Sequence, residues 1–206
     1  MQFTPISHPF DKLLPEKDAF LSTDHKEMTS RLSYLKSLRG IGVFTSPPGF
    51  GKTFALRCFA KTVDRNLNEI AYLCLSTVRL TEFYRQFCSA LGIDPPYGKF
   101  AMFQAIQERI YHLFKEKKKP LILIFDEAHD LNASILKDIK LIMNADYDSN
   151  NCFTLVLAGE PHLNNILEKP IHEALRQRIV IHYNFNALSD AETEQYLLHT
   201  CNECKR

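Results

Sequence analysis

The chain has 206 residues, of which 45% are apolar and 24% charged, so it is long enough for one main domain with a substantial core. Its formal net charge is only +1, which excludes a general positive field that would attract nucleic acid or an anionic membrane. No apolar run approaches the length of about 18 residues that a membrane span needs, and the N-terminus lacks a signal-peptide profile, so we expect a cytoplasmic protein.

Five short apolar segments are predicted to be buried strands, because continuous apolarity is typical of a parallel sheet that is covered on both faces. They span residues 41–45, 70–75, 121–125, 153–158 and 179–183. Helical patterns lie at residues 53–63, 81–91, 100–115, 133–143 and 161–167, and a last helix is predicted to begin after Ser189. This alternation predicts an α/β fold with right-handed crossovers.

The segment after the first predicted strand has the spacing of a phosphate-binding loop, with serine in place of the first glycine. It reads Ser46-Pro47-Pro48-Gly49-Phe50-Gly51-Lys52-Thr53. Glycines allow backbone N–H groups to curl around phosphates, and the next helix directs its positive end at them. Lys52 would neutralise the phosphate oxygens, and the Thr53 hydroxyl would bind Mg²⁺. The predicted nucleotide contacts are Pro48, Gly49, Phe50, Gly51, Lys52, Thr53 and Phe54.

The third predicted strand ends in two acids, Asp126 and Glu127, at the carboxyl edge where α/β sheets bind ligands. We expect Asp126 to hold Mg²⁺ through water and Glu127 to orient or deprotonate the attacking water. A P-loop kinase does not need the second acid, so Glu127 favours hydrolysis. The letters DEAH also occur in a helicase group, but those enzymes bind ATP between two tandem domains and this chain holds one. His129 is therefore interpreted as a helix-entry residue.

Two further segments narrow the class of nucleotide-binding protein that the sequence indicates. They are AGEPHL at 158–163 and LRQRI at 175–179. With the P-loop and the acidic pair, they resemble bacterial AAA+ ATPases of the ExeA, TniB and TnsC kind, which are mostly transposon helper proteins. The resemblance covers nearly the whole chain. It implies a P-loop NTPase with a five-stranded parallel sheet of order 5-1-4-3-2 that binds ATP and Mg²⁺. It also implies a linker near the nucleotide base (1–40), an AAA+ core (41–186) and the start of a largely absent helical lid (187–206).

The same resemblance implies roles for residues outside the two motifs. Glu160 stands at the sensor-1 position, where relatives usually carry a neutral polar residue, so a sensing role and a loop-capping role both remain open. Arg178, with Arg176 as the alternative, matches the arginine finger that would reach the ATP of a neighbouring subunit, although the helix dipole also favours arginine there. Phe10 and His25 would line the adenine.

The partners are also implied by the resemblance. We expect a homo-oligomer, as a ring or helical filament, that assembles on duplex DNA with ATP, contacts no membrane and recruits a transposase or integrase, with hydrolysis as the release step. Candidate DNA contacts are Thr77, Arg79 and Lys99, while the basic run at 115–119 is interpreted first as a solvated helix end. A nucleotide switch with little turnover, a secretion ATPase, which predicts a membrane span, and a replication loader remain alternatives.

Overall fold

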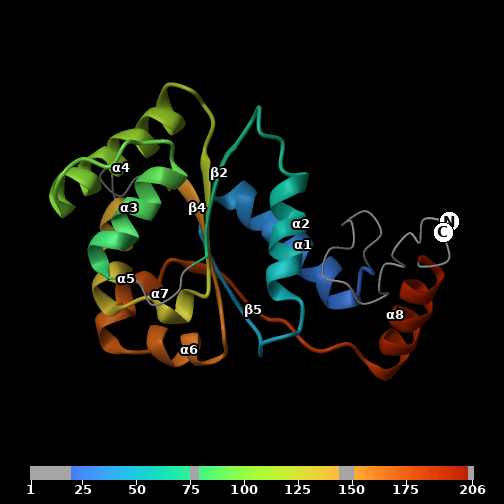
Figure 1. The fold of residues 1–206 in the computed structure, drawn as a ribbon. Helices are drawn as coiled ribbons and strands as arrows, with labels where there is room; N and C mark the ends of the chain where they lie inside the picture. The colour runs from blue at the N-terminus through green and yellow to red at the C-terminus, as the bar shows by residue number, and fades with distance from the viewer. Residues whose placement is uncertain (1–19, 75–78, 144–150, 204–206) are drawn as a thin grey trace, which may run out of the picture.

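The computed structural model describes residues 20–74, 79–143 and 151–203 and contains the predicted parallel sheet (Figure 1). The five strands are β1 (Ile41–Thr45), β2 (Glu69–Cys74), β3 (Leu121–Asp126), β4 (Phe153–Gly159) and β5 (Ile179–Asn184). All neighbouring strands run parallel in the order β2-β3-β4-β1-β5, which is the predicted order counted from the other edge. The fold prediction is therefore confirmed, and β4 separates β1 from β3.

Helices cover both faces of the sheet (Figure 1). One face carries α1 (Thr23–Leu38) and α2 (Lys52–Thr62). The other face carries α3 (Leu80–Ala90), α4 (Lys99–Lys115), α5 (Ala133–Met143), α6 (His162–Leu167) and α7 (Glu173–Arg176). Two short 3-10 turns complete this side, η2 (Ala128–Asp130) and η3 (Pro170–His172). Among the helices of the described ranges, none combines the length and the apolarity that a membrane crossing requires.

Alternate residues of β1, β2, β3 and β4 enter two separate cores, because successive strand side chains point to opposite faces. In β3, Leu123 and Phe125 pack on the side of α3 to α7, whereas Ile122 and Ile124 pack on the side of α1 and α2. All four side chains are buried, which explains why the strand has a continuous apolar sequence. The same alternation places Asp126, the next residue, on the face that carries α2.

Residues 23–38 form α1, although the sequence suggested only a linker before the first strand. The Ser22 side chain caps the helix by accepting a hydrogen bond from the His25 N–H (3.1 Å). The buried positions of α1 recur at helical spacing: His25, Met28, Leu32 and Leu35. The apolar stripe is only one residue wide per turn, so the helical period was easy to miss in the sequence.

The last helix, α8 (Asp190–Glu203), begins with the cap predicted at Ser189. Ser189 Oγ accepts a hydrogen bond from the Glu192 N–H (3.3 Å), and Glu192 Oε2 accepts one from the Ser189 N–H (3.1 Å), which together form a capping box. Glu192 Oε1 also accepts the Thr23 N–H (2.7 Å) and so joins α8 to the start of α1. These hydrogen bonds, the Thr23 backbone N–H first, lower the pKa of Glu192 from 4.5 to about 2.

We expect Glu192→Ala to loosen α8 from α1, because Thr23 and Ser189 lose their shared acceptor. Amide hydrogen exchange at Thr23 should accelerate in this variant, whereas Glu194→Ala, at an exposed position of the same helix, should leave it unchanged. Since the folded pKa is lowered, the contribution of Glu192 is complete above pH 4.5 and is lost as the pH falls through about 2. A carboxyl titration by NMR with a midpoint near 4.5 would contradict this contact.

Candidate active site

The carboxyl ends of β1, β3 and β4 meet at one edge of the sheet, because all three strands run parallel. The loop after β1 is attached to the end of β4 by a hydrogen bond from the Ser46 N–H to the Gly159 carbonyl (3.1 Å). It is attached to β5 through the Phe185 N–H, which donates to the Thr45 carbonyl (2.7 Å). The loop therefore starts from a fixed position between two strands.

The loop itself requires glycine at two positions. Gly49 has φ +83° and Gly51 has φ +97°, a left-handed conformation that side-chain-bearing residues rarely adopt. Gly51 is the N-cap of α2, and its carbonyl accepts the first helical hydrogen bond, from the Ala55 N–H (2.9 Å). Free N–H groups at a helix N-terminus attract anions. The backbone thus has the shape and polarity that a phosphate group needs.

Ser46, which replaces the first glycine of the motif, is accommodated inside the fold. It is 1% exposed, and its hydroxyl oxygen is buried without a hydrogen-bond partner among the described residues. A buried unpaired hydroxyl is unfavourable, so a ligand that supplies a polar partner fits this position.

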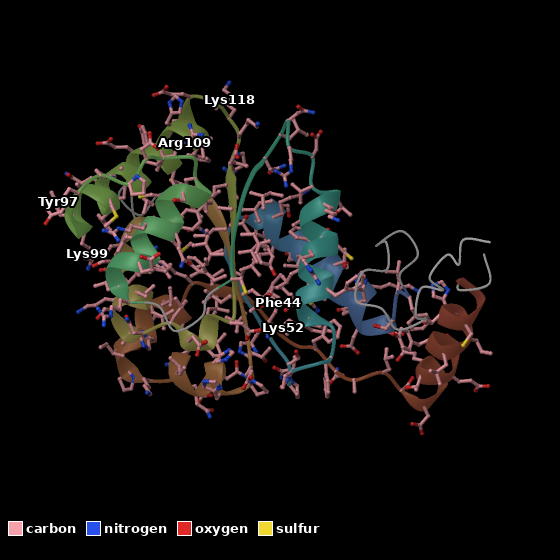
Figure 2. All side chains as sticks on the ribbon, in the orientation of Figure 1. Phe44, Lys52, Tyr97, Lys99, Arg109 and Lys118 are labelled. Atoms are coloured by element: carbon pink, nitrogen blue, oxygen red, sulfur yellow. The ribbon has the colours of Figure 1, made fainter. Side chains whose placement is uncertain are left out.

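Lys52 is the first residue of α2 and is only 6% exposed. Its Nζ lies 3.9 Å from Glu127 Oε2, which is beyond hydrogen-bonding distance. Burying an ammonium group is unfavourable unless it is paired and hydrogen-bonded, so negatively charged oxygens in front of Lys52 would satisfy it. Figure 2 shows Lys52 at the start of α2.

Asp126 is 1% exposed at the end of β3. Its Oδ2 accepts a hydrogen bond from the Tyr72 hydroxyl on β2 (2.7 Å), and its Oδ1 accepts the Glu127 N–H (3.1 Å). Burial, together with the hydrogen bond to Asp126, raises the pKa of Tyr72 well above its ordinary value, so the hydroxyl remains a donor at neutral pH. Tyr72 is a contact that the sequence analysis did not predict.

Glu127 adopts φ +58°, which is uncommon for a residue with a side chain and is often found at functional sites. Its side chain is 37% exposed, and Oε2 lies 3.9 Å from Lys52 Nζ and 3.3 Å from His129 Nδ1. The described structure thus brings together Lys52, Asp126 and Glu127, as the two sequence motifs predicted.

Glu160 follows directly after β4 and contacts two histidines. Its backbone N–H donates to His129 Nδ1 (3.2 Å), and its carboxylate lies 3.9 Å from His129 Nε2 and 3.8 Å from His162 Nδ1. The sequence analysis assigned His129 to the entry of a helix, and it does lie in the turn η2. Its contacts with Glu127 and Glu160 were not predicted. Its position two residues after the acidic pair could have indicated a contact with Glu127.

Arg178 lies in the turn between α7 and β5 and is half-buried. The alternative, Arg176, donates from Nη1 to the Glu168 carbonyl (3.1 Å), a contact within the chain.

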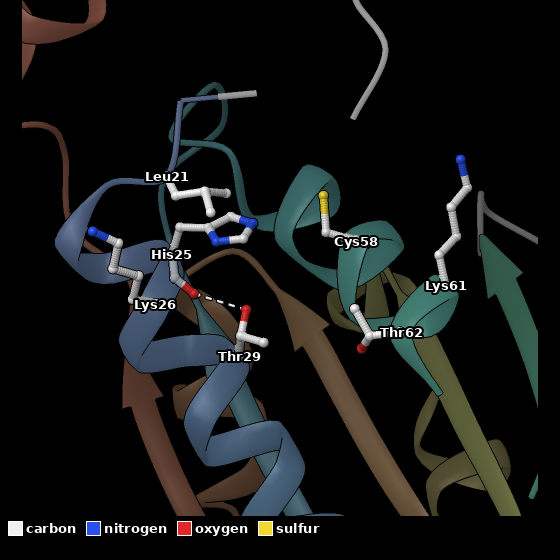
Figure 3. Close-up of a pocket in the computed structure, with 7 residues that line it drawn as sticks. All are labelled: Leu21, His25, Lys26, Thr29, Cys58, Lys61 and Thr62. Atoms are coloured by element: carbon white, nitrogen blue, oxygen red, sulfur yellow. Dashed lines mark hydrogen bonds between the residues drawn. The ribbon is translucent and has the colours of Figure 1, made fainter. Parts of the chain in front are cut away.

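His25 lines a cavity between α1 and α2 (Figure 3), and its ring also approaches that of Phe54 in α2. Their ring centroids are 5.9 Å apart, and His25 Nε2 is buried without a hydrogen-bond partner in the described part of the chain. The cavity measures about 500 Å³. Its lining residues are Leu21, His25, Lys26, Thr29, Cys58, Lys61 and Thr62. Burial lowers the pKa of His25, with Lys26 as the second cause, so its imidazole is neutral at pH 7. Phe10 lies outside the described residues.

The predicted DNA contacts differ in their surroundings. Lys99 Nζ lies 2.6 Å from Asp138 Oδ2 and 5.5 Å from the centre of the Tyr84 ring, so it has a structural role within the chain. Arg79 is exposed at the start of α3, and Thr77 lies outside the described residues. Lys118 belongs to the basic run before β3, and Figure 2 shows it at the edge of the sheet opposite Lys52.

The sheet order, the glycine loop before α2 and the acids after β3 define a P-loop fold of the AAA+ type. Residues 35–167 match the family model described as "AAA domain", and the chain belongs to this family. Over 202 residues it is 28% identical to general secretion pathway protein A of Aeromonas hydrophila, a match that covers 95% of this chain and 36% of that protein. The chain thus spans about a third of the length of this curated relative.

Solved structures with a similar fold include two archaeal proteins. Cdc6p from Pyrobaculum aerophilum has a TM-score of 0.71 at 18% identity, over 92% of this chain and 54% of that chain. The ORC1 protein of Aeropyrum pernix, solved in complex with DNA, has a TM-score of 0.66 at 14% identity, over 93% of this chain and 52% of that chain. At these identities the likeness shows the fold alone.

Proposed function

We propose that the chain binds ATP with Mg²⁺ and hydrolyses it to ADP and phosphate. The observation that carries this proposal is the buried Lys52 ammonium, which lies 3.9 Å from Glu127 Oε2 and follows a loop whose glycines Gly49 and Gly51 have positive φ. These groups fit a triphosphate chemically, because the Ser46 hydroxyl has no hydrogen-bond partner among the described residues, Lys52 Nζ lies beyond hydrogen-bonding distance of Glu127, and the glycine loop leads into the N-terminus of α2.

In this proposal each residue has one task. Gly49 and Gly51 expose the backbone N–H groups, and Lys52 neutralises the phosphate oxygens. Thr53 and Asp126 would hold Mg²⁺, which would offset the charge that develops on the transferred phosphoryl group. Glu127 orients the attacking water and takes its proton.

The adenine base would lie beside Phe54 and His25. The support is the 5.9 Å approach of the two rings and the unpaired His25 Nε2, which offers a hydrogen-bonding partner to a purine edge. The start of α8, joined to Thr23 through Glu192, would close this side as the first part of a lid.

The Tyr72 hydroxyl is expected to keep Asp126 in the orientation that Mg²⁺ requires. Tyr72→Phe should lower the apparent affinity for Mg²⁺ about tenfold, because groups that hydrogen-bond to a metal ligand orient it. Turnover at saturating ATP and increasing Mg²⁺ measures this effect. Tyr111→Phe, on the exposed side of α4, is the matched control. A Mg²⁺ dependence equal to that of the native chain would refute the role of Tyr72.

Arg178 is proposed to act on the ATP of a neighbouring subunit in a homo-oligomer. Arg178→Ala should then lower turnover about 100-fold without weakening ATP binding, whereas Arg176→Ala should have a small effect. Mixing Arg178→Ala subunits with Glu127→Gln subunits should restore part of the activity, because some interfaces combine an intact Glu127 with an intact Arg178. A mixture as inactive as both parent variants would count against action between subunits.

For the biological role, we propose a DNA-transposition helper that assembles on duplex DNA as a ring or filament and recruits a transposase. The support is the resemblance of the segments 158–163 and 175–179 to transposon helper ATPases, together with a fold shared with DNA-bound ORC1. A replication-loader role would use the same ATPase core and is an alternative.

A secretion-type ATPase is the second candidate, because general secretion pathway protein A matches 95% of the chain. The sequence analysis disfavoured this role for want of a membrane span. That argument does not exclude the role, because the chain covers only 36% of the length of this relative. A nucleotide switch with little turnover is the remaining alternative, and it is favoured by the carboxylate of Glu160 at the sensor-1 position.

Two experiments separate these candidates. ATP hydrolysis is measured with and without duplex DNA, and stimulation by DNA supports the DNA-assembled ATPase. Electron microscopy of the chain with duplex DNA and a non-hydrolysable ATP analogue should reveal ordered filaments or rings. Turnover without DNA stimulation and without assembly on DNA favours the secretion role. ATP binding without any turnover favours the switch.

A further inference from the structure

His129 occupies a space that the end of β4 leaves for it. The imidazole lies in η2 and is only 12% exposed. A Cβ on Gly159 would come within 3.1 Å of the His129 backbone nitrogen and 3.2 Å of Nδ1, closer than nearly all real contacts of this type. Glycine at the end of β4 therefore permits the imidazole to lie between the ends of β3 and β4.

The imidazole contacts groups from both strand ends. Nδ1 lies 3.3 Å from Glu127 Oε2 and accepts the Glu160 backbone N–H at 3.2 Å. The ring of His162 packs edge-on against it, with centroids 4.8 Å apart. The Glu160 backbone at the end of β4 thus holds the ring in place. The ring also contacts the Glu127 carboxylate, which follows β3.

The Glu127 side chain needs a neighbour that fixes its orientation. Its side chain is 37% exposed and has three rotatable bonds, so without a fixed contact it would sample several rotamers. Hydrolysis requires one of these orientations, because the catalytic carboxylate must meet the attacking water within hydrogen-bonding distance.

The Nδ1 atom of His129 also links the end of β3 to the end of β4. With a lone pair on Nδ1, His129 accepts a hydrogen bond from the Glu160 N–H, or from the Glu127 carboxyl once that carboxyl has taken a proton from water. With a proton on Nδ1, it donates to the Glu127 carboxylate instead. Any shift of the Glu160 backbone therefore changes the partner that His129 offers to Glu127.

We propose that His129 is a positioning residue for hydrolysis, which orients Glu127 and couples it to the end of β4 through the Glu160 N–H. The inference rests on the proposed ATPase function, and it assigns to His129 a role beyond the two sequence motifs. His129 acts through Glu127 and makes no contact of its own with the reacting atoms.

The test compares His129→Ala, His129→Asn and the control His112→Ala, which changes a half-exposed histidine paired with Glu116 on α4. His129→Ala should lower kcat about tenfold to 100-fold, because a misplaced catalytic group loses rate in this range. Its calorimetric affinity for a non-hydrolysable ATP analogue should remain native. His129→Asn keeps a polar atom near the position of Nδ1 and should retain more activity, and thermal unfolding identifies any variant that fails to fold.

The decisive comparison adds Glu127→Gln. If His129 acts through Glu127, the double variant Glu127→Gln/His129→Ala should be no slower than Glu127→Gln alone. A native kcat in folded His129→Ala, a kcat in folded His129→Asn no higher than in His129→Ala, or an unchanged additional loss in the double variant would overturn the inference while the ATPase function stands. Absence of turnover in the native chain would overturn the proposed function and this inference with it.

Discussion

Replacing Lys52 with methionine is expected to weaken ATP binding about 100-fold, the largest effect on affinity of any single substitution at this site. The ammonium is 6% exposed at the start of α2, and a hydrogen bond to a charged group in such a place contributes about 3 kcal/mol. Methionine keeps most of the length and the apolar character of the side chain, so the loss reports on the charge. Fluorescence titration with a labelled ATP analogue measures it.

The control for this prediction is Lys137→Met, which removes an exposed ammonium from α5 on the other side of the sheet. It should bind nucleotide as the native chain does. Equal affinities for the native chain and for folded Lys52→Met would mean that the phosphates lie elsewhere, and the P-loop assignment would then be wrong.

Glu127→Gln is expected to leave ATP binding nearly native and to lower turnover at least about 100-fold. Glutamine has the same shape, but it cannot take a proton from water, and phosphoryl transfer depends on a well-oriented nucleophile. The carboxylate also lies 3.9 Å from Lys52 Nζ, so its neutralisation removes a nearby negative charge and should not reduce affinity for the triphosphate.

Single-turnover measurement of phosphate release separates binding from chemistry in this variant. Asp130→Asn is a suitable comparison, because Asp130 is a neighbouring carboxylate that ends η2 and is 38% exposed in its side chain. Its turnover should be close to native. If Glu127→Gln releases phosphate at the native rate, another group is the general base.

The sequence predicted those parts of the site that depend on local spacing. Gly49, Gly51 and Lys52 lie within four positions of one another, and their roles follow from the backbone conformation that a phosphate loop needs. The apolar strand before Asp126 predicted the position of this residue at the carboxyl edge of the sheet in the same way. The strand order needed the family resemblance, because hydrophobic patterning does not determine which strands are neighbours.

The contacts that were missed are between residues far apart in the sequence. Tyr72 reaches Asp126 across 54 positions, and His129 meets the Glu160 N–H across 31 positions. Neither residue belongs to a motif, so only the pairing of β2 with β3 and the approach of β4 to η2 bring them to the site. The ion pair of Lys99 with Asp138, which lies on another helix, was missed for the same reason.

The central claim is that a Mg²⁺-bound triphosphate binds at the glycine loop in front of Lys52. Isothermal titration calorimetry of the native chain with ATP and Mg²⁺ tests it most directly. The account predicts saturable binding with one nucleotide per chain, which is weakened about 100-fold in Lys52→Met and is also weakened when Mg²⁺ is chelated. Absence of binding heat over a range of temperatures, or unchanged binding in Lys52→Met, would contradict it.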